Sequence, residues 1–174
     1  MKVLLLVANR SAVTGLIPSF QEAFFQLHID GKVFIVNEDK IYQKQRKELK
    51  KYIVDHGIDR LLCINDFCQN GEYLVDQEIA ELAHCYIWFV DSMYSMKTPD
   101  STLSLYEKVS SFEPKDTALS SVYHKTMHYV PLTMGNNIFC TAPENVEKKY
   151  DISFVGLVSG SKKRLKILNA IAKY

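Results

Sequence analysis

The sequence lacks the charge and the apolar length that mark nucleic-acid-binding and membrane-spanning proteins. Its 21 Lys and Arg residues are balanced by 20 Asp and Glu residues, which leaves a net charge of +1. Nucleic-acid-binding proteins usually carry a clearly basic balance or stripe, so we expect no nucleic-acid partner. No apolar run approaches the roughly 20 residues that cross a bilayer, so we expect no transmembrane segment.

Metal-ligand spacings and export signals are also missing. The four cysteines form no CxxC pair, and the five histidines form no HxH pair. Such groupings usually supply zinc ligands, so no metal site is expected. Cys63 and Cys85 lie in apolar runs typical of strands, and we interpret them as core thiols. The N-terminal apolar run, residues 3–8, is too short for a signal peptide. With no disulfide framework either, the sequence predicts a cytoplasmic protein.

The familiar nucleotide-binding and hydrolase motifs do not occur. Residues 9–15 read Asn-Arg-Ser-Ala-Val-Thr-Gly, which is neither GxGxxG nor a P-loop. There is no GxSxG segment, so a hydrolase would have no recognisable nucleophile. Two interpretations of residues 9–15 stay open. Ser11 or Thr14 could cap a helix, or Asn9, Arg10 and Ser11 could bind a ligand.

The residues that are present favour a folded α/β domain. Apolar residues make up 47% of the chain and charged residues 24%, which suits a globular core. Short apolar runs alternate with longer amphipathic ones, the pattern of βαβ units. The sequence therefore predicts a Rossmann-like, mostly parallel sheet flanked by helices. The expected strands are residues 2–8, 32–36, 60–64, 85–90, 108–112 and 127–131, and the expected helices are 16–27, 38–56, 72–82 and 115–123. A turn is expected at Asp30-Gly31 and a helix end at Gly57.

The pattern changes near residue 145. Residues 132–149 show no clear period and read as a linker. A strand at 151–155 and a helix from Lys162 follow it. We predict an N-terminal Rossmann-like domain over residues 1–145, and the first βα unit of a second Rossmann-like domain over residues 146–174. A lone βα unit cannot bury both faces of its strand, so we expect the rest of that domain to lie past Tyr174.

The densest basic run, residues 44–51, lies inside the expected helix 38–56. A charged run in an amphipathic helix usually forms a solvated face, and that is our interpretation. Phosphate binding is the alternative.

Acidic residues follow several expected strands. Ligands of open α/β sheets bind outside the carboxyl ends of the strands. Asp66 and Asp91 stand at two such ends, where a carboxylate could act as a general base or bind sugar hydroxyls. A cap is the alternative for each, and we favour it for Asp66 but not for Asp91. The strand before Asp91, residues 86–90, is aromatic and suits sugar stacking. Glu113 could face the same cleft, although Glu before Pro is common in loops.

Several segments resemble the CgeB-like (spore maturation protein-like) bacterial glycosyltransferases. Residues 87–92 (Ile-Trp-Phe-Val-Asp-Ser) and 111–116 (Ser-Phe-Glu-Pro-Lys-Asp) resemble strand ends of that family's first domain. Its interdomain passage is similar to residues 129–132 (Tyr-Val-Pro-Leu), 137–139 (Asn-Ile-Phe), 149–156 (Lys-Tyr-Asp-Ile-Ser-Phe-Val-Gly) and 163–168. The resemblance covers most of the chain through short motifs.

The resemblance implies the N-terminal domain of a GT-B glycosyltransferase, in which the first domain binds the acceptor and the second binds the nucleotide-sugar donor. Asp91 matches the family's strand-end Asp and is our catalytic candidate. The expected acceptor-binding residues are Asn9, Arg10, Ser11, Asp66, Ser92 and Glu113, and the expected donor phosphate-binding residues are Gly156, Ser161 and Arg164. The last group lies in a basic loop that could equally be an exposed helix start.

The same resemblance sets the expected cofactors and partners. No bound cofactor is expected, since a nucleotide-sugar serves as donor substrate and a glycan or protein as acceptor. The acids that hold the donor ribose would lie past Tyr174, so the chain alone should not transfer sugar. The sequence indicates no particular oligomeric state.

A non-catalytic Rossmann-like or receiver-like ligand-binding module is the alternative function. A receiver usually has an acidic pair after its first strand and a phosphorylatable Asp after its third. Asp66 fits the second requirement, but Asn9-Arg10 does not fit the first.

Overall fold

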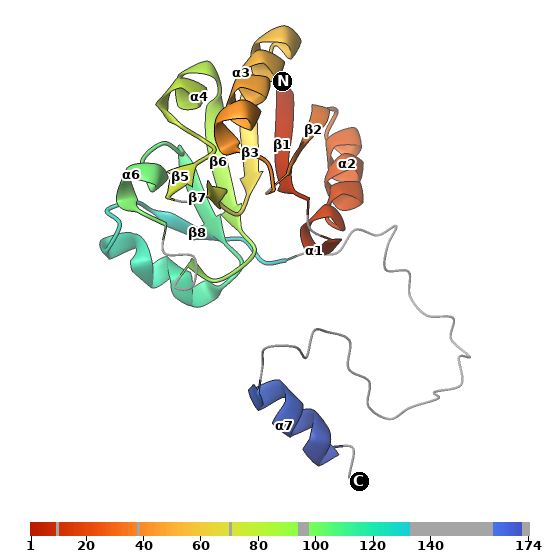
Figure 1. Cartoon of the computed structure of the whole chain (residues 1–174), viewed down its shortest axis with the longest axis vertical. Coiled ribbons are helices and arrows are strands. Elements are labelled where there is room, and N and C mark those ends of the chain that lie inside the picture. The colour runs from red at the N-terminus through yellow and green to blue at the C-terminus, as the bar shows by residue number, and fades with distance from the viewer. Residues whose placement is uncertain (10, 38, 70, 94–97, 133–161, 172–174) are drawn as a thin grey trace, which may run out of the picture. The chain divides into compact units, whose positions relative to one another are not determined.

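The computed structural model describes residues 1–9, 11–37, 39–69, 71–93, 98–132 and 162–171. The chain divides into two compact units, Met1–Cys140 and Thr141–Tyr174. The first holds a six-stranded sheet, and the described part of the second is helix α7, Lys162–Ile171 (Figure 1). The expected strand at residues 151–155 lies outside the described residues. A second Rossmann-like domain therefore stays a prediction.

The main sheet confirms the predicted α/β, Rossmann-like class. Its strand order is β2-β1-β3-β6-β7-β8, and every neighbouring pair is parallel. The strands are β1 Lys2–Ala8, β2 Asp30–Val36, β3 Arg60–Ile64, β6 His84–Phe89, β7 Lys108–Ser111 and β8 Met127–Tyr129. All residues of β1 after Lys2 are buried. This is the pattern of a central parallel strand with helices on both faces.

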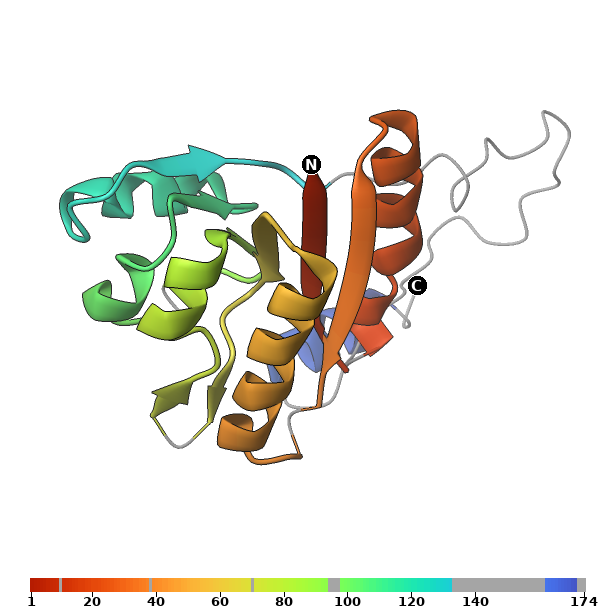
Figure 2. The ribbon, with the colours of Figure 1, turned by 90° about the horizontal axis from the view of Figure 1, so that it is seen from above.

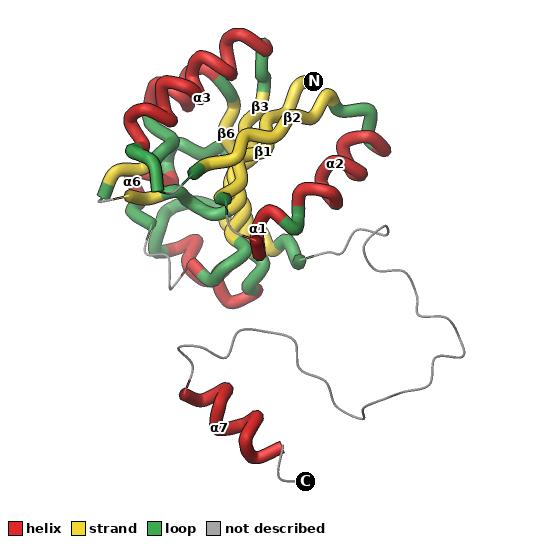
Figure 3. The backbone as a smooth tube through the Cα atoms, turned by 45° about the vertical axis from the view of Figure 1, so that its right-hand side comes forward, coloured by secondary structure: helices red, strands yellow, loops and turns green. Residues whose placement is uncertain are grey.

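Helices form two layers around this sheet. They are α1 Ser11–Thr14, α2 Ile17–Gln26, α3 Tyr42–His56, α4 Gln77–Leu82, α6 Asp100–Leu103 and the 3₁₀ helix η1 Pro114–Ser121. Seen from above, β2 lies between α3 and α2 (Figure 2), and α3 and α2 flank the strands in the tube view as well (Figure 3). Phe24 of α2 packs with Leu5 and Val7 on one face, whereas Leu49 of α3 and Ile79 of α4 join the core of the other.

The predicted turn at Asp30-Gly31 is wrong, because these residues begin β2. The chain turns earlier, at His28, which has a left-handed φ of 53°. A Cβ on Gly31 would lie 2.0 Å from Cδ2 of Phe24, so the glycine lets that aromatic ring lie against the strand. The Asp-Gly pair, a common turn signal, serves packing in this protein.

The predicted helix over residues 72–82 begins later than expected. Its first part forms a small antiparallel pair, β4 Cys68–Gln69 with β5 Glu72–Tyr73. Helix α4 begins only after Asp76, whose carboxylate accepts a hydrogen bond from the Ile79 N–H at 3.0 Å. Such a cap satisfies a free amide of the first turn and fixes where the helix begins. The predicted end of α3 is confirmed, since Gly57 adopts a left-handed φ of 57°.

Candidate functional site

The topology selects one edge of the sheet as a binding site. From β1 the chain runs to β2 on one side, and β3 then pairs with β1 on the other side. Doubly wound sheets bind ligands at such a switch point, outside the carboxyl ends of the strands. Leu6 of β1 pairs with Cys63 of β3, so the two strands reach the same edge of the sheet, where Asn9 follows Ala8 and Asp66 comes two residues after Ile64. Helix α1 lies at this end of β1 (Figure 1).

Asn65 joins the carboxyl ends of β3 and β6. Its Oδ1 accepts a hydrogen bond from the Val90 N–H at 2.7 Å, and its Nδ2 donates to Oδ2 of Asp91 at 3.0 Å. The backbone of Asn65 is left-handed, with a φ of 62°, a conformation that Asn tolerates better than most residues. The structure thus brings the end of β3 to the catalytic candidate Asp91, which is exposed and held at this edge.

Asp66 lies in a partly buried position beside Asn65. The hydroxyl of Thr98 donates a hydrogen bond to Oδ2 of Asp66. Burial raises the pKa of the Asp66 carboxyl group, and the hydrogen bond from Thr98 opposes that shift. The partners described for the Asp66 carboxylate are thus Thr98 and the Asp66 backbone, and neither lies in the first turn of a helix. A carboxyl group with a raised pKa at the ligand edge suits proton transfer or sugar binding.

The raised pKa of Asp66 predicts how stability depends on pH. The protonated carboxyl favours the folded state, so its contribution is fully present below the ordinary pKa of 3.8 and is lost as the pH rises through the higher folded-state pKa. Asn at this position stays neutral. We therefore expect Asp66→Asn to gain stability relative to the wild type as the pH is raised from about 4 to about 7.

Urea denaturation across this pH range measures the effect. Asp100→Asn is the matched control, because it removes an exposed carboxylate at the start of α6. A stability difference between Asp66→Asn and the wild type that stays constant with pH would contradict the prediction.

A buried carboxylate, Asp116, holds the segment that follows β6. Ser92 Oγ donates to Oδ1 of Asp116 at 3.1 Å. Oδ2 accepts from the Met93 N–H at 2.9 Å and from Ser111 Oγ at 2.6 Å. Asp116 has no exposed surface. It therefore ties residues 92 and 93 to the end of β7, a role that the sequence did not indicate.

Glu113 has a local hydrogen-bonding role in the structure. Its carboxylate accepts a hydrogen bond from the Lys115 N–H at 3.3 Å and caps η1. Its own N–H donates to Ser111 Oγ at 3.1 Å. Glu113 is thereby connected through Ser111 to the Asp116 network. Its proposed contact with an acceptor stays a prediction.

The other predicted site residues are described to different extents. The Asn9 N–H donates to the Val36 carbonyl oxygen at 2.8 Å, and its side chain is exposed at the switch-point edge. Ser11 begins α1. Arg164 is exposed in the first turn of α7. Three further residues lie outside the described part of the chain: Arg10, Gly156 and Ser161.

An aromatic cavity of about 380 Å³ opens on the sheet face that carries α2. Phe20 of α2 and Tyr86 and Trp88 of β6 line it, together with Leu62, Ile87, Lys108, Ser110, Val130 and Pro131. The Trp88 ring is fixed, because its Nε1 donates to the Val130 carbonyl oxygen at 3.0 Å and Phe20 packs edge-on at 5.9 Å. The volume falls within the range of about 300–1,000 Å³ typical of ligand sites.

The two strand cysteines are core residues, as predicted. Cys63 and Cys85 are buried, and burial raises the pKa of both thiols, that of Cys85 to about 12. Thiols with such pKa values stay protonated and unreactive near neutral pH. Within the described residues, no group of three or more His, Cys, Asp or Glu side chains could hold a metal ion. None of the described helices has the length and apolar character that crossing a membrane requires.

A scan against known protein families, a search of curated proteins and a search of solved structures each find no match to this chain. The fold class therefore rests on the strand order and pairing of the sheet itself. Any function has to be argued from the residues at its carboxyl edge.

Proposed function

We propose that the first unit is the acceptor-side domain of a GT-B glycosyltransferase, which moves a sugar from a nucleotide-sugar donor to a glycan or protein acceptor. The observation that carries the proposal is the Asp91 carboxylate, exposed at the end of β6 and held by Asn65 at 3.0 Å. A rigidly held, solvent-facing carboxylate at this edge suits a general base.

The chemistry assigned to Asp91 is proton abstraction from an acceptor hydroxyl. Asn65 Nδ2 contacts Oδ2 of the carboxylate, and the other oxygen receives the proton. The acceptor oxygen then bonds to the anomeric carbon of the donor sugar, whose bond to the nucleoside diphosphate breaks. Two further side chains form hydrogen bonds with the acceptor's other hydroxyls: Asp66, after the neighbouring strand, and the half-buried Ser92. Both strand ends are fixed through Asn65, so these groups keep their spacing as the acceptor binds.

The aromatic cavity supports a carbohydrate ligand. Trp88 and Tyr86 line it, and both belong to the strand that ends before Asp91. Aromatic rings pack well against the C–H face of a sugar, while hydroxyls need polar partners such as Ser110 and Lys108 in the same lining.

The donor side of the proposal rests on the second unit. Lys162, Lys163 and Arg164 are exposed in the first turn of α7. A basic helix N-terminus favours the diphosphate of a nucleotide-sugar, because the helix dipole and the cations both attract negative charge. Gly156 and Ser161 are the other residues proposed to hold this group. No bound cofactor is required, since the leaving diphosphate is neutralised by protein groups.

Binding of acceptor sugars to the 174-residue chain tests the proposal. A panel of mono- and disaccharides, titrated by nuclear magnetic resonance, should contain ligands that shift resonances of β6 and of the segment after it. Asp91→Asn should weaken their binding about 10-fold, because one charge-assisted hydrogen bond becomes neutral. Asp100→Asn, at the exposed first position of α6, should leave their binding unchanged. A panel without any saccharide that binds, or equal affinities for Asp91→Asn and wild type, would refute the assignment of Asp91.

A receiver-like module is the second candidate, favoured by the strand order and by Asp66 at the end of β3. The flavodoxin-like order, in which the first strand lies between the second and third, also occurs in phosphoacceptor receivers. Against it, the end of β1 offers Asn9 where receivers carry acids. Mg²⁺-dependent labelling of Asp66 by a small phosphodonor, absent in Asp66→Asn, would favour this function over sugar transfer.

A further inference from the structure

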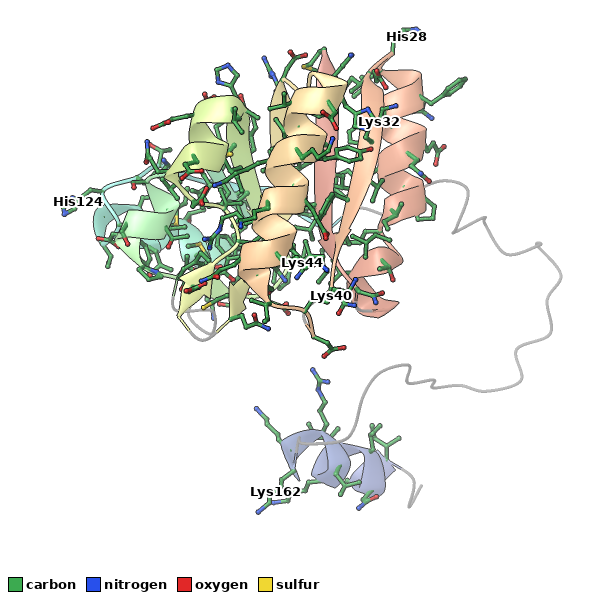
Figure 4. The ribbon with its side chains drawn as sticks, turned by 45° about the horizontal axis from the view of Figure 1, so that its top comes forward. His28, Lys32, Lys40, Lys44, His124 and Lys162 are labelled. Atoms are coloured by element: carbon green, nitrogen blue, oxygen red, sulfur yellow. The ribbon has the colours of Figure 1, made fainter. Side chains whose placement is uncertain are left out.

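A cavity of about 580 Å³ lies at the N-terminal end of α3. Its lining contains three lysines, Lys40, Lys44 and Lys47, against one acid, Asp39; Ile41 and Gln43 complete it. Lys40 and Lys44 lie near one another at this end of the helix (Figure 4). The cavity is thus a concave surface with an excess of positive charge.

The structure divides the basic run of α3 into two groups. The cations away from the cavity are paired: Arg46 and Lys50 each lie 3.2 Å from Asp76, and Lys51 pairs with Asp55. No described acid forms an ion pair with the three lysines of the cavity. Ion pairs with acids therefore account for one part of the run, whereas Lys44 and Lys47 are exposed and have charge available for a ligand.

The backbone adds donors to the same place. Helix α3 begins after Ile41, without a side-chain cap and without an acid in its first turn. First-turn amides such as those of Gln43 and Lys44 have no acceptor within a helix, and the helix dipole is positive there. Both residues line the cavity.

The segment that leads into the cavity is held in place by a buried amide. Gln45 is 3% exposed. Its Oε1 accepts from the Asn37 N–H at 2.8 Å, and its Nε2 donates to the carbonyl oxygens of Asn37 at 2.7 Å and Lys40 at 3.2 Å. Three hydrogen bonds from one side chain fix the backbone before the helix. The backbone at Asn37 and Lys40, beside the cavity, is therefore held before a ligand arrives, which lowers the entropic cost of ordering it on binding.

From these observations we propose that the cavity binds a small ligand through a phosphate or diphosphate group. Compact lysine ammonium groups and free amides are the usual partners of phosphate oxygens. The cavity follows β2, whose last residue, Val36, bonds to Asn9, so it opens at the same edge as the switch point. The assignment does not depend on sugar transfer. The near-neutral charge of the chain favours a small molecule over a nucleic acid.

Isothermal titration calorimetry of the full chain with inorganic phosphate, pyrophosphate and a hexose phosphate tests the site. Pyrophosphate should bind saturably, and its affinity should fall as the salt concentration is raised. Lys44→Gln and Lys47→Gln should each weaken it about 5- to 10-fold, because each removes one charge-assisted contact. Lys51→Gln is the matched control, an exposed lysine of the same helix paired with Asp55, and should bind as the wild type does. Circular dichroism confirms that each variant is folded.

The three ligands also identify the source of the phosphate. Equal affinity for pyrophosphate and the hexose phosphate indicates that the site recognises the phosphate groups alone. Tighter binding of the hexose phosphate indicates that the natural ligand is a phosphorylated sugar. The proposal is overturned if no ligand binds saturably, if Lys51→Gln loses as much affinity as the other variants, or if a single-stranded oligonucleotide binds more tightly than any of them. Loss of sugar binding in Asp91→Asn with phosphate binding intact would separate this site from the glycosyltransferase proposal.

Discussion

Asp116→Ala is expected to lower the free energy of unfolding by about 3–5 kcal/mol, because it removes the acceptor of a buried network. The Met93 N–H and the Ser111 hydroxyl both donate to Oδ2 of Asp116, and both residues are 1% exposed. Water cannot replace the lost carboxylate at full strength in so buried a place. The hydrogen bond from Ser92 is lost as well.

Urea denaturation of Asp116→Ala and Asp116→Asn measures this effect. Asn has nearly the same volume and keeps one carbonyl oxygen, so we expect it to lose roughly half as much stability as Ala. A double-mutant cycle with Ser111→Ala should give a coupling energy of about 1 kcal/mol or more, since the two side chains are in direct contact. A loss below about 1 kcal/mol for Asp116→Ala would show that the network contributes little.

Asp116 also connects stability to the proposed site. It holds Ser92 and Met93, the residues directly after Asp91. Asp116 need not touch an acceptor to affect its binding, since it positions the segment that carries the base. The sequence motif that contains Asp116, residues 111–116, therefore has a structural explanation that does not require any family relationship.

The parts of the fold that the sequence predicted best are the buried central strands. β1 and β3 have the predicted bounds, Lys2–Ala8 and Arg60–Ile64, because each is a short apolar run between polar residues. The order of the strands could not be read from these runs, since it depends on which buried faces pack together. The turn predicted at Asp30-Gly31 was wrong for a similar reason, because Gly31 makes room for the Phe24 ring of α2.

The candidate site shows the same division. Asp66 and Asp91 could be predicted as site residues because each follows an apolar run, and the end of such a run can be recognised from the neighbouring residues alone. Asn65 and Asp116 were missed as connecting residues, because their partners are distant in sequence, 26 residues away in Asp91 and 24 in Ser92. The charge left in the lysine cavity depends on which cations of α3 form ion pairs with acids of other elements. Asp76 pairs with Arg46 and Lys50 across 26 residues or more, which spacing along one helix cannot reveal.

Asn65→Ala should lower the free energy of unfolding by about 2–4 kcal/mol, the second-largest loss expected after that of Asp116→Ala. Alanine loses the acceptor for the Val90 N–H, and it fits the left-handed φ of 62° less well than asparagine. Asn65→Gly separates the two causes, because glycine adopts this φ without strain. We expect the glycine variant to be more stable than the alanine variant by about 1 kcal/mol, as judged by urea denaturation.

The glycine variant also isolates what Asn65 does for Asp91. It keeps the backbone path at the end of β3 but removes the amide that holds Oδ2 of Asp91. If Asp91 must be held to act on an acceptor, Asn65→Gly will weaken saccharide binding although most of its stability remains. Wild-type saccharide affinity in Asn65→Gly would mean that Asn65 serves only to join β3 to β6. Equal stabilities of the alanine and glycine variants would show that the left-handed backbone carries no strain, leaving the Val90 hydrogen bond as the whole stabilising effect of this side chain.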